Sequence, residues 1–330
     1  MEKLILIGGQ AGQGTDRTSL LLAKALTGLG YDVFVYRDYP SVIKGSHNFS
    51  VLKISDQPVY SHENFYDVII ALDQKTIEIH KKDLRQGGFV LGDKNLQAGN
   101  LIGVDLESIL EKLKVPPIFG NNVLLGALFK TLGLPLTALS EIFEKEFGAK
   151  AELLKKTAQE GYQAIGEKTE LFSTLKKPKY FLSGSQAVAS GAVAAGLDVY
   201  LAYPMTPATP VLHLLAAQQE KEKIAVFQLE NEIAIINAAL GASYAGAMTM
   251  VGTSGGGFAL MSEAMSLSGM AEIPLVVYLA QRTAPATGVP TYTFQGDLKF
   301  AVNVGHGEFP RIVVAPGDAR EAIARTIEAF

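Results

Sequence analysis

The sequence predicts an α/β protein with two domains, and three observations support this. The chain has 330 residues, 48% of them hydrophobic, so length and composition favour two domains over one. Short apolar runs of strand type alternate with helical runs along most of the chain, which is typical of α/β folds. In residues 171–179 three lysines surround the helix-breaking Pro178, and this is our expected linker. We therefore predict an α/β domain at 1–170 and a second domain, built on a doubly wound parallel sheet, at 180–330.

Composition argues against several classes of function. The chain carries 29 Lys and Arg against 33 Asp and Glu, with no basic block interleaved with aromatics, so nucleic acid is not an expected partner. The N-terminal run MEKLILIGG is too short for a signal peptide or a membrane span, and we expect a cytoplasmic protein without membrane contact. Cysteine is absent, which excludes disulfides, thiolate nucleophiles and the usual ligands of an iron–sulfur cluster. The five histidines show no metal-ligand spacing, so we predict no metal site made by this chain alone.

The first half predicts an α/β module with some antiparallel pairing. Its expected strands are Lys3–Ile7, Asp32–Tyr36, a hairpin of Asn48–Ser55 with Val59–Ser61, Asp67–Leu72 and Gly88–Gly92. Its expected helices are Ser19–Leu29, Asp73–Asp83, Val123–Leu132, Leu136–Phe147 and Lys150–Glu170, the last three being amphipathic helices that close the domain.

A glycine-rich loop, Gly8–Thr15, joins the first strand to the first helix. Glycines let the backbone approach a phosphate, and the amides at a helix start favour an anion. However, Gly9, Gly12 and Gly14 do not have the dinucleotide spacing, and no Walker lysine follows. A tight turn without a ligand is therefore an equally good interpretation.

A nicotinamide site is an alternative for this half. Asp38 follows the second strand, where such folds place a ribose-binding acid beside the glycine loop. A turn aspartate before Pro40 explains the same residue more simply. The polar loop Tyr39–Asn48, with Lys44, Ser46 and His47, is either solvated or functional.

The second half repeats the strand-to-helix pattern. We expect strands at Leu197–Tyr203, Ala225–Leu229, Met248–Gly252, Pro274–Ala280 and Ile312–Ala315, and helices at Ser183–Gly196, Ile233–Ala245 and Asp318–Phe330.

Polar fragments follow four of these strands. They are YPMTP with Thr206, ENE with Glu232, TSGGG with Ser254 and QR with Arg282. In an open parallel sheet, residues just past the carboxyl ends of the strands face one crevice, where such folds bind ligands. We therefore expect these four side chains to share a site.

Each of these residues also has an ordinary structural explanation. Thr206 could belong to a proline-punctuated turn before a helix. Glu232 could be a helix-dipole partner in a first turn. Arg282 is suited to bidentate capture of a carboxylate, but a surface ion pair would be the slightly better explanation if it stood alone. Their occurrence at successive strand ends favours a functional site.

At YPMTP, FQLENEIAIINAALGASYAGA, VGTSGGGFALMSEA and LVVYLAQRTAPATGVPTYTFQGDL the sequence resembles the α subunit of 2-oxoacid:ferredoxin oxidoreductases, especially the 2-oxoglutarate type. The first half, with GGQAGQGT and RDYPSVIKGSHNFSVLKISDQPV, resembles the γ domain that many of these enzymes carry before α. The resemblance covers nearly the whole chain. It implies a γ-type domain followed by a pyrimidine-type thiamine diphosphate-binding domain.

The resemblance also implies roles for individual residues. Glu232 matches the glutamate that bonds the aminopyrimidine of thiamine diphosphate, Thr206 would hydrogen-bond the substrate, and Arg282 would hold its carboxylate. Cofactor contacts are further implied for Tyr203, Pro204 and Ser254. Because the γ domain is associated with coenzyme A, the loop residues Gly12, Gln13, Gly14 and Thr15 would cradle its diphosphate.

The implied reaction is coenzyme A-dependent oxidative decarboxylation of a 2-oxoacid, or its reverse, with electrons passed to ferredoxin. This chain has neither a magnesium–diphosphate motif nor cysteines, so Mg²⁺ and a [4Fe-4S] cluster are expected on a β subunit within a hetero-oligomer. A decayed, non-catalytic assembly module is a further alternative.

Two departures from the family pattern are visible. Met205 stands where isoleucine is common, a mild apolar change. The family's α subunit continues beyond the equivalent of Phe330, so we expect a truncated or split chain whose sheet edge needs covering.

Overall fold

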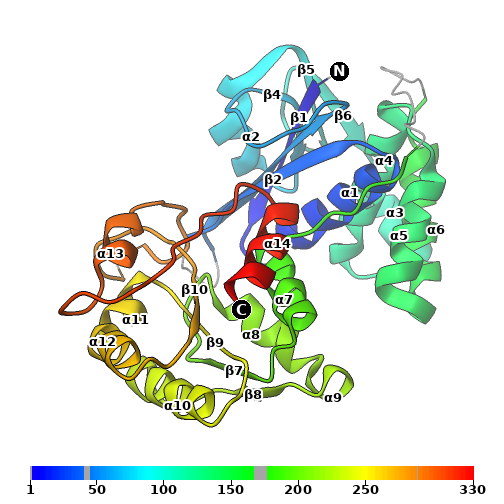
Figure 1. Ribbon diagram of the computed structural model, residues 1–330. Helices are drawn as coiled ribbons and strands as arrows, with labels where there is room; N and C mark the ends of the chain where they lie inside the picture. The colour runs from blue at the N-terminus through cyan, green and yellow to red at the C-terminus, as the bar shows by residue number, and fades with distance from the viewer. Residues whose placement is uncertain (1, 41–44, 167–176, 288) are drawn as a thin grey trace. The chain divides into compact units, whose positions relative to one another are not determined.

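The computed structural model describes residues 2–40, 45–166, 177–287 and 289–330. The chain divides into two compact units, Met1–Phe181 and Leu182–Phe330, shown in blue to green and in green to red in Figure 1. The predicted linker at 171–179 lies largely outside the described residues. No helix in the described ranges is both long enough and apolar enough to cross a membrane.

The first unit is built on a six-stranded sheet in the order β2-β3-β1-β4-β5-β6. Its strands are β1 (Glu2–Gln10), β2 (Asp32–Asp38), β3 (His47–Ser55), β4 (Tyr66–Ala71), β5 (Leu84–Asp93) and β6 (Leu101–Val104). Its helices are α1 (Thr15–Gly28), α2 (Gln74–His80), α3 (Leu106–Leu113), α4 (Gly120–Thr131), α5 (Leu136–Phe147) and α6 (Ala151–Gln163).

Strand β1 is central because both of its faces are buried. Leu4 and Leu6 pack toward one core, while Ile5 and Ile7 pack into the other, which also holds α1 and α4–α6. β1, β4, β5 and β6 are parallel, whereas β3 runs antiparallel to both β1 and β2. The predicted hairpin with Val59–Ser61 is wrong, since β3 already pairs with strands on both of its edges and leaves no edge for another strand.

Helices α4 and α6 cross with their backbones in close contact. A Cβ placed on Gly126 of α4 would lie 1.9 Å from the Ala158 carbonyl oxygen, and one placed on Gly161 of α6 would lie 1.9 Å from that of Val123. No side chain fits at either position. The two glycines are therefore required by packing, and they stabilise a helix pair that covers one face of the sheet.

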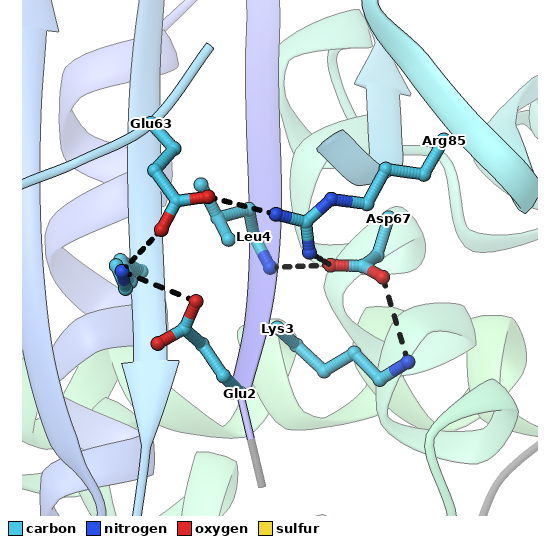
Figure 2. A network of polar contacts seen from close by, with 7 residues as sticks. Glu2, Lys3, Leu4, Glu63, Asp67 and Arg85 are labelled. Atoms are coloured by element: carbon cyan, nitrogen blue, oxygen red, sulfur yellow. Dashed lines mark hydrogen bonds and ion pairs between the residues drawn. The ribbon is translucent and has the colours of Figure 1, made fainter. Parts of the chain in front are cut away.

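An ion-pair network joins β1, β3, β4 and β5 (Figure 2). Glu63 links Lys53 of β3 to Arg85 of β5, with distances of 2.5 and 2.9 Å. Arg85 continues to Asp67 of β4, which also accepts the Leu4 N–H at 2.9 Å. The network lies near the amino ends of β1, β4 and β5, at the edge opposite the glycine loop, and we interpret it as structural.

The second unit has an all-parallel sheet in the order β10-β9-β7-β8. Its strands are β7 (Val199–Ala202), β8 (Ala225–Phe227), β9 (Thr249–Thr253) and β10 (Val276–Leu279). Its helices are α7 (Gly184–Ala195), α8 (Thr209–Ala216), α9 (Gln219–Glu222), α10 (Glu232–Tyr244), α11 (Gly255–Leu260), α12 (Ser262–Met270), α13 (Leu298–Asn303) and α14 (Ala319–Ala329).

The sheet of the second unit is covered on both faces (Figure 1). Residues of α7 and α8 pack on the face that carries Tyr200, and residues of α10, α11 and α12 pack on the face that carries Leu201. After β7, the chain first adds β8 on one side of it and then adds β9 and β10 on the other side. The direction in which strands are added therefore reverses between β7 and β9. This is the switch point at which open α/β sheets form a ligand crevice.

One predicted strand of this unit is wrong. Ile312–Ala315 forms no strand, and the Ile312 side chain is 93% exposed. An apolar run becomes a strand only where a neighbouring strand can pair with it, and this run has no such neighbour among the described residues. The helix that follows, α14, does form and packs on α7.

Candidate functional site

Four side chains predicted to share a site follow the carboxyl ends of the four parallel strands. Thr206 comes after β7, Glu232 after β8, Ser254 after β9 and Arg282 after β10. Because all four strands run in one direction, these positions lie at one edge of the sheet. Helix α10 packs across β7 and β9, which carries its first residue, Glu232, toward the middle of that edge.

Glu232 is only 4% exposed although it begins a helix. Asn231 caps that helix by accepting the Ala234 N–H at 2.9 Å. The Glu232 side chain turns toward the start of α11, where its Oε1 would lie 2.6 Å from a Cβ placed on Gly257. That oxygen is buried and has no hydrogen-bond partner among the described residues. A dipole partner would be solvated, so this explanation fits the exposed Glu230 and not Glu232.

Arg282 is 6% exposed, and its loop has no helix or strand. Its Nη1 donates to the backbone oxygen of Thr206 at 2.8 Å. No described carboxylate forms an ion pair with this guanidinium, so the surface ion-pair explanation does not hold. Thr206 itself lies in a turn four residues beyond β7, not at the strand tip as the sequence predicted.

The start of α11 is a stretch of backbone without side chains, Gly255, Gly256 and Gly257. Each glycine faces a charged group. Asp297 Oδ2 would lie 2.8 Å from a Cβ placed on Gly255, and Arg282 Nη2 would lie 4.0 Å from a Cβ placed on Gly256. Glu232 Oε1 would lie 2.6 Å from a Cβ placed on Gly257. The preceding Ser254 is fully buried, and its Oγ has no partner. The structure thus brings Glu232, Ser254 and Arg282 to one helix start, where polar atoms remain free for a ligand.

Two further predicted contacts lie at the rim of this edge. Tyr203 is 39% exposed, and Pro204 is also exposed, immediately after β7. Neither is drawn into the buried cluster, and their contact with a cofactor stays a prediction.

The sequence analysis missed Asp297. This residue is 7% exposed, and its carboxylate rests on Gly255. Its position before α13 suggests an ordinary N-cap, but its side chain makes no capping hydrogen bond. The detectable signal was the pair Gly296–Asp297 in a polar loop, which is also a common turn signature.

The glycine loop of the first unit is shorter than predicted, because β1 continues to Gln10 and includes Gly8 and Gly9. Gly12 and Gly14 have φ values of 99° and 81°, a region that favours glycine. The Gln13 side chain folds back to accept the Gln10 N–H at 2.6 Å, and the Gln13 carbonyl accepts from Asn121 at 2.8 Å. Thr15 is buried at 6% exposure, so its contribution to an anion cradle is limited to its backbone.

A cavity of 370 Å³ lies beside this loop. It is lined by Gln10, Gly45, Ser46, His47, Asp73, Gln74 and Lys75. The Ala11 N–H donates to the Ser46 carbonyl at 2.8 Å, which ties the glycine loop to the polar loop. Ser46 and His47 of that loop therefore line a hollow, whereas Lys44 lies outside the described residues.

One residue of the cavity lining, the half-buried His47, contacts the buried His80. The Nε2 atoms of His47 and His80 are 2.9 Å apart, so one ring donates and the other accepts. Burial lowers the pKa of His80 to about 4, with His47 acting in the same direction. Burial also lowers the pKa of His47, against the opposing charge of Asp73. Both rings are therefore neutral at neutral pH.

We expect this pair to make folding pH-dependent. Above about pH 6.5, His80 is neutral in the folded and unfolded chains; as the pH falls toward about 4, only the unfolded chain gains a proton, so stability falls. Between pH 7.5 and 5 the loss in free energy of unfolding attributable to His80 should be about 2 kcal/mol. Urea unfolding at both pH values measures it. His80→Gln should flatten the pH dependence, while the exposed control His213→Gln should not; equal slopes in all three proteins would contradict the assignment.

The first unit does not have the topology of a nicotinamide-binding fold. In such folds the strand bearing the ribose-binding acid lies beside the glycine-loop strand and parallel to it. Here β3 separates β2 from β1 and is antiparallel to both. Asp38 at the end of β2 instead accepts the Tyr36 hydroxyl at 3.2 Å. The geometric basis of the nicotinamide alternative is therefore wrong.

Comparison with known families matches both halves of the chain. Residues 4–164 match the family described as pyruvate ferredoxin/flavodoxin oxidoreductase. Residues 190–330 match the thiamine diphosphate-binding domain of pyruvate flavodoxin/ferredoxin oxidoreductase. These matches confirm the predicted fold class for both domains.

Individual relatives agree with this result. The chain is 32% identical to the 2-oxoacid:ferredoxin oxidoreductase subunit alpha of Saccharolobus solfataricus, over 96% of this chain and 60% of that protein. It is 30% identical to the 2-oxoglutarate oxidoreductase subunit KorA of Mycobacterium tuberculosis, over 99% of this chain and 58% of the relative. The chain thus spans about three fifths of the length of these relatives.

A solved structure is similar over almost the whole chain. It is the 2-oxoglutarate:ferredoxin oxidoreductase of Magnetococcus marinus with 2-oxoglutarate, coenzyme A and succinyl-CoA bound. The TM-score is 0.89 at 29% identity, covering 99% of this chain and 60% of that one. Together with the two family matches and the curated relatives, this makes the chain similar over nearly its whole length to the alpha subunits of 2-oxoacid:ferredoxin oxidoreductases, with a gamma-like first half.

Proposed function

We propose that this chain is the fused γ–α subunit of a 2-oxoacid:ferredoxin oxidoreductase and supplies the pyrimidine side of a thiamine diphosphate site. The observation that carries the proposal is the meeting of Glu232, Ser254 and Arg282 at the glycine start of α11, with polar atoms left unpartnered. Buried groups of this kind are costly unless a ligand completes them.

The residues of this cluster fit an aminopyrimidine and a 2-oxoacid. The buried Oε1 of Glu232 suits a hydrogen bond to a pyrimidine ring nitrogen, and Gly255–Gly257 allow a ring to approach the backbone. Thiamine diphosphate supplies carbanion stabilisation when it is bound. Arg282 would hold the substrate carboxylate through the guanidinium donors that Thr206 does not use, and the Thr206 hydroxyl would hydrogen-bond the substrate.

The proposed reaction converts a 2-oxoacid anion, coenzyme A and two oxidised ferredoxins to an acyl-CoA, carbon dioxide, two singly reduced ferredoxins and one proton, or runs in reverse. The 2-oxoglutarate-specific names of similar proteins make this dicarboxylate the first substrate to test. Coenzyme A would use the first unit, where Gly12–Thr15 and the 370 Å³ cavity lie together.

The chemistry of this reaction needs an electron-transfer group that these residues cannot hold. Single electrons must leave through an iron–sulfur cluster, which cysteine thiolates hold, and these 330 residues contain no cysteine. A β subunit would supply the [4Fe-4S] cluster and most ligands of the Mg²⁺ that binds the diphosphate. Ferredoxin would then take the electrons from the hetero-oligomer.

Reconstitution tests the proposal. The chain is co-purified with a β-type partner, loaded with thiamine diphosphate and Mg²⁺, and assayed for reduction of a low-potential dye. We expect reduction that depends on both a 2-oxoacid and coenzyme A, with no response to NAD(P)H. A folded complex that retains thiamine diphosphate but turns over neither 2-oxoglutarate nor pyruvate would contradict it.

A further inference from the structure

Asp297 is a buried acid without a donor. It is 7% exposed, and no hydrogen bond or ion pair reaches its carboxylate from the described residues. Its oxygens would lie 2.8 and 3.0 Å from a Cβ placed on Gly255, so the carboxylate rests directly on the first residue of α11. Because no hydrogen bond or ion pair of the described residues uses this carboxylate, its contribution to stability is small, and a role in the neighbouring site is the better explanation.

The same residue is coupled to the loop that carries Arg282. The Asp297 N–H donates to Oε1 of Gln281 at 3.1 Å, and Gln281 directly precedes Arg282. At the base of the loop, the Ala280 N–H donates to the Thr253 carbonyl of β9 at 2.9 Å. Both ends of the 281–297 segment are therefore held against the α11 start.

The charges of Asp297 and Arg282 flank neighbouring residues of that helix start. The Asp297 carboxylate lies over Gly255, and Nη2 of Arg282 lies 4.0 Å from a Cβ placed on Gly256. The carboxylate and the guanidinium do not form an ion pair with each other. Opposite charges attract each other in a partly buried site, and the guanidinium keeps donors other than the Nη1 group that bonds the Thr206 carbonyl. The Asp297 carboxylate can thus orient the Arg282 side chain without using its hydrogen-bond donors.

We propose that Asp297 is a positioning residue that keeps the Arg282 guanidinium turned toward the start of α11, ready to bind the carboxylate of the substrate. This inference rests on the proposed function and adds a residue to its substrate site. It predicts that the negative charge of Asp297 matters for substrate binding more than for the stability of the protein.

Asp297→Asn tests this because it keeps the shape and removes the charge. In the reconstituted complex we expect KM for the 2-oxoacid to rise about tenfold, the effect of a charge interaction across several ångströms, with a smaller change in kcat. The melting temperature should change little, because the Asp297 carboxylate makes no hydrogen bond or ion pair with the described residues. A merely structural residue would instead lose stability and activity together. Asp318→Asn, an exposed helix cap of the same unit, is the control and should change neither.

A second variant approaches the contact from the other side. Gly255→Ala would place a Cβ against the Asp297 carboxylate and displace it, and the same rise in KM is expected. Adding Asp297→Asn to Gly255→Ala should then raise KM little further, since both changes remove one interaction. Full additivity of the two effects would overturn the proposal.

Substrate binding is measured separately from turnover, through the increase in melting temperature that the 2-oxoacid produces in the loaded complex. If that increase is present in the wild type but turnover is absent, the proposed reaction is contradicted. The role of Asp297 can then still be tested by comparing the increase in melting temperature between the wild type and Asp297→Asn. If Asp297→Asn shows the same increase as the wild type at every 2-oxoacid concentration, the positioning role is overturned.

Discussion

Replacing Glu232 with glutamine is expected to reduce turnover of the reconstituted complex by about 10²- to 10⁴-fold, the usual contribution of a positioned acid–base group. The amide keeps the size of the side chain but cannot exchange the proton that the carboxyl group handles. Its buried, unpartnered Oε1 is the structural reason for this expectation. The rate is measured by dye reduction at saturating 2-oxoacid and coenzyme A.

The same substitution should leave the protein folded. Glutamine replaces a buried carboxylate that no described residue pairs, so the melting temperature should stay the same or rise. Glu230→Gln is the matched control, because Glu230 lies two residues earlier and is exposed, and it should keep full activity. Comparable losses in both variants, or full activity in Glu232→Gln, would dismiss the assigned role.

Gly126→Ala is expected to destabilise the first unit by about 3 kcal/mol or more, as overpacking of a close helix contact does. The added methyl would lie 1.9 Å from the Ala158 carbonyl oxygen, which is backbone and cannot move aside as a side chain would. Gly161→Ala should behave similarly, since its methyl meets the Val123 carbonyl at the same distance. Helices α4 and α6 would have to separate in either variant.

Urea unfolding, read out by hydrogen exchange of residues 120–163, measures this loss in the unit concerned. Gly28→Ala is the control, because Gly28 lies at the end of α1 and no atom lies within 4 Å of the new Cβ. This variant should have unchanged stability or be stabilised by about 0.4–1 kcal/mol. A loss of less than about 1 kcal/mol in Gly126→Ala, below the usual range for overpacking, would show that the helices do not approach this closely.

Much of the second unit could be predicted because the pattern of apolar runs and polar residues that defines its strands is local in the sequence. Each apolar run has the length of a buried strand, and in a parallel sheet every residue that follows a strand lies at the same edge. Thr206, Glu232, Ser254 and Arg282 were therefore placeable from their spacing. Ile312–Ala315 has the same local signal, yet it has no described strand to pair with, and sequence alone does not reveal a missing neighbour.

The sequence could not predict which of the polar side chains are buried. Glu230 and Glu232 are two residues apart and chemically identical, but Glu230 is exposed in the loop before α10, whereas Glu232, the first residue of α10, lies against Gly257. Asp297 was missed for the same reason, since a Gly–Asp pair before a helix has the features of an ordinary turn. The nicotinamide alternative could be excluded only when β3 was seen between β2 and β1.

The sequence by itself determined the alternation of strands and helices, the glycine loop and the set of polar residues at the strand ends, because these depend on residues close together in the chain. Only the tertiary structure decided the order of the strands, the burial of Glu232, Arg282 and Asp297, and their meeting at three glycines. Those features depend on contacts between segments tens of residues apart, and such contacts leave no periodic pattern in a single sequence.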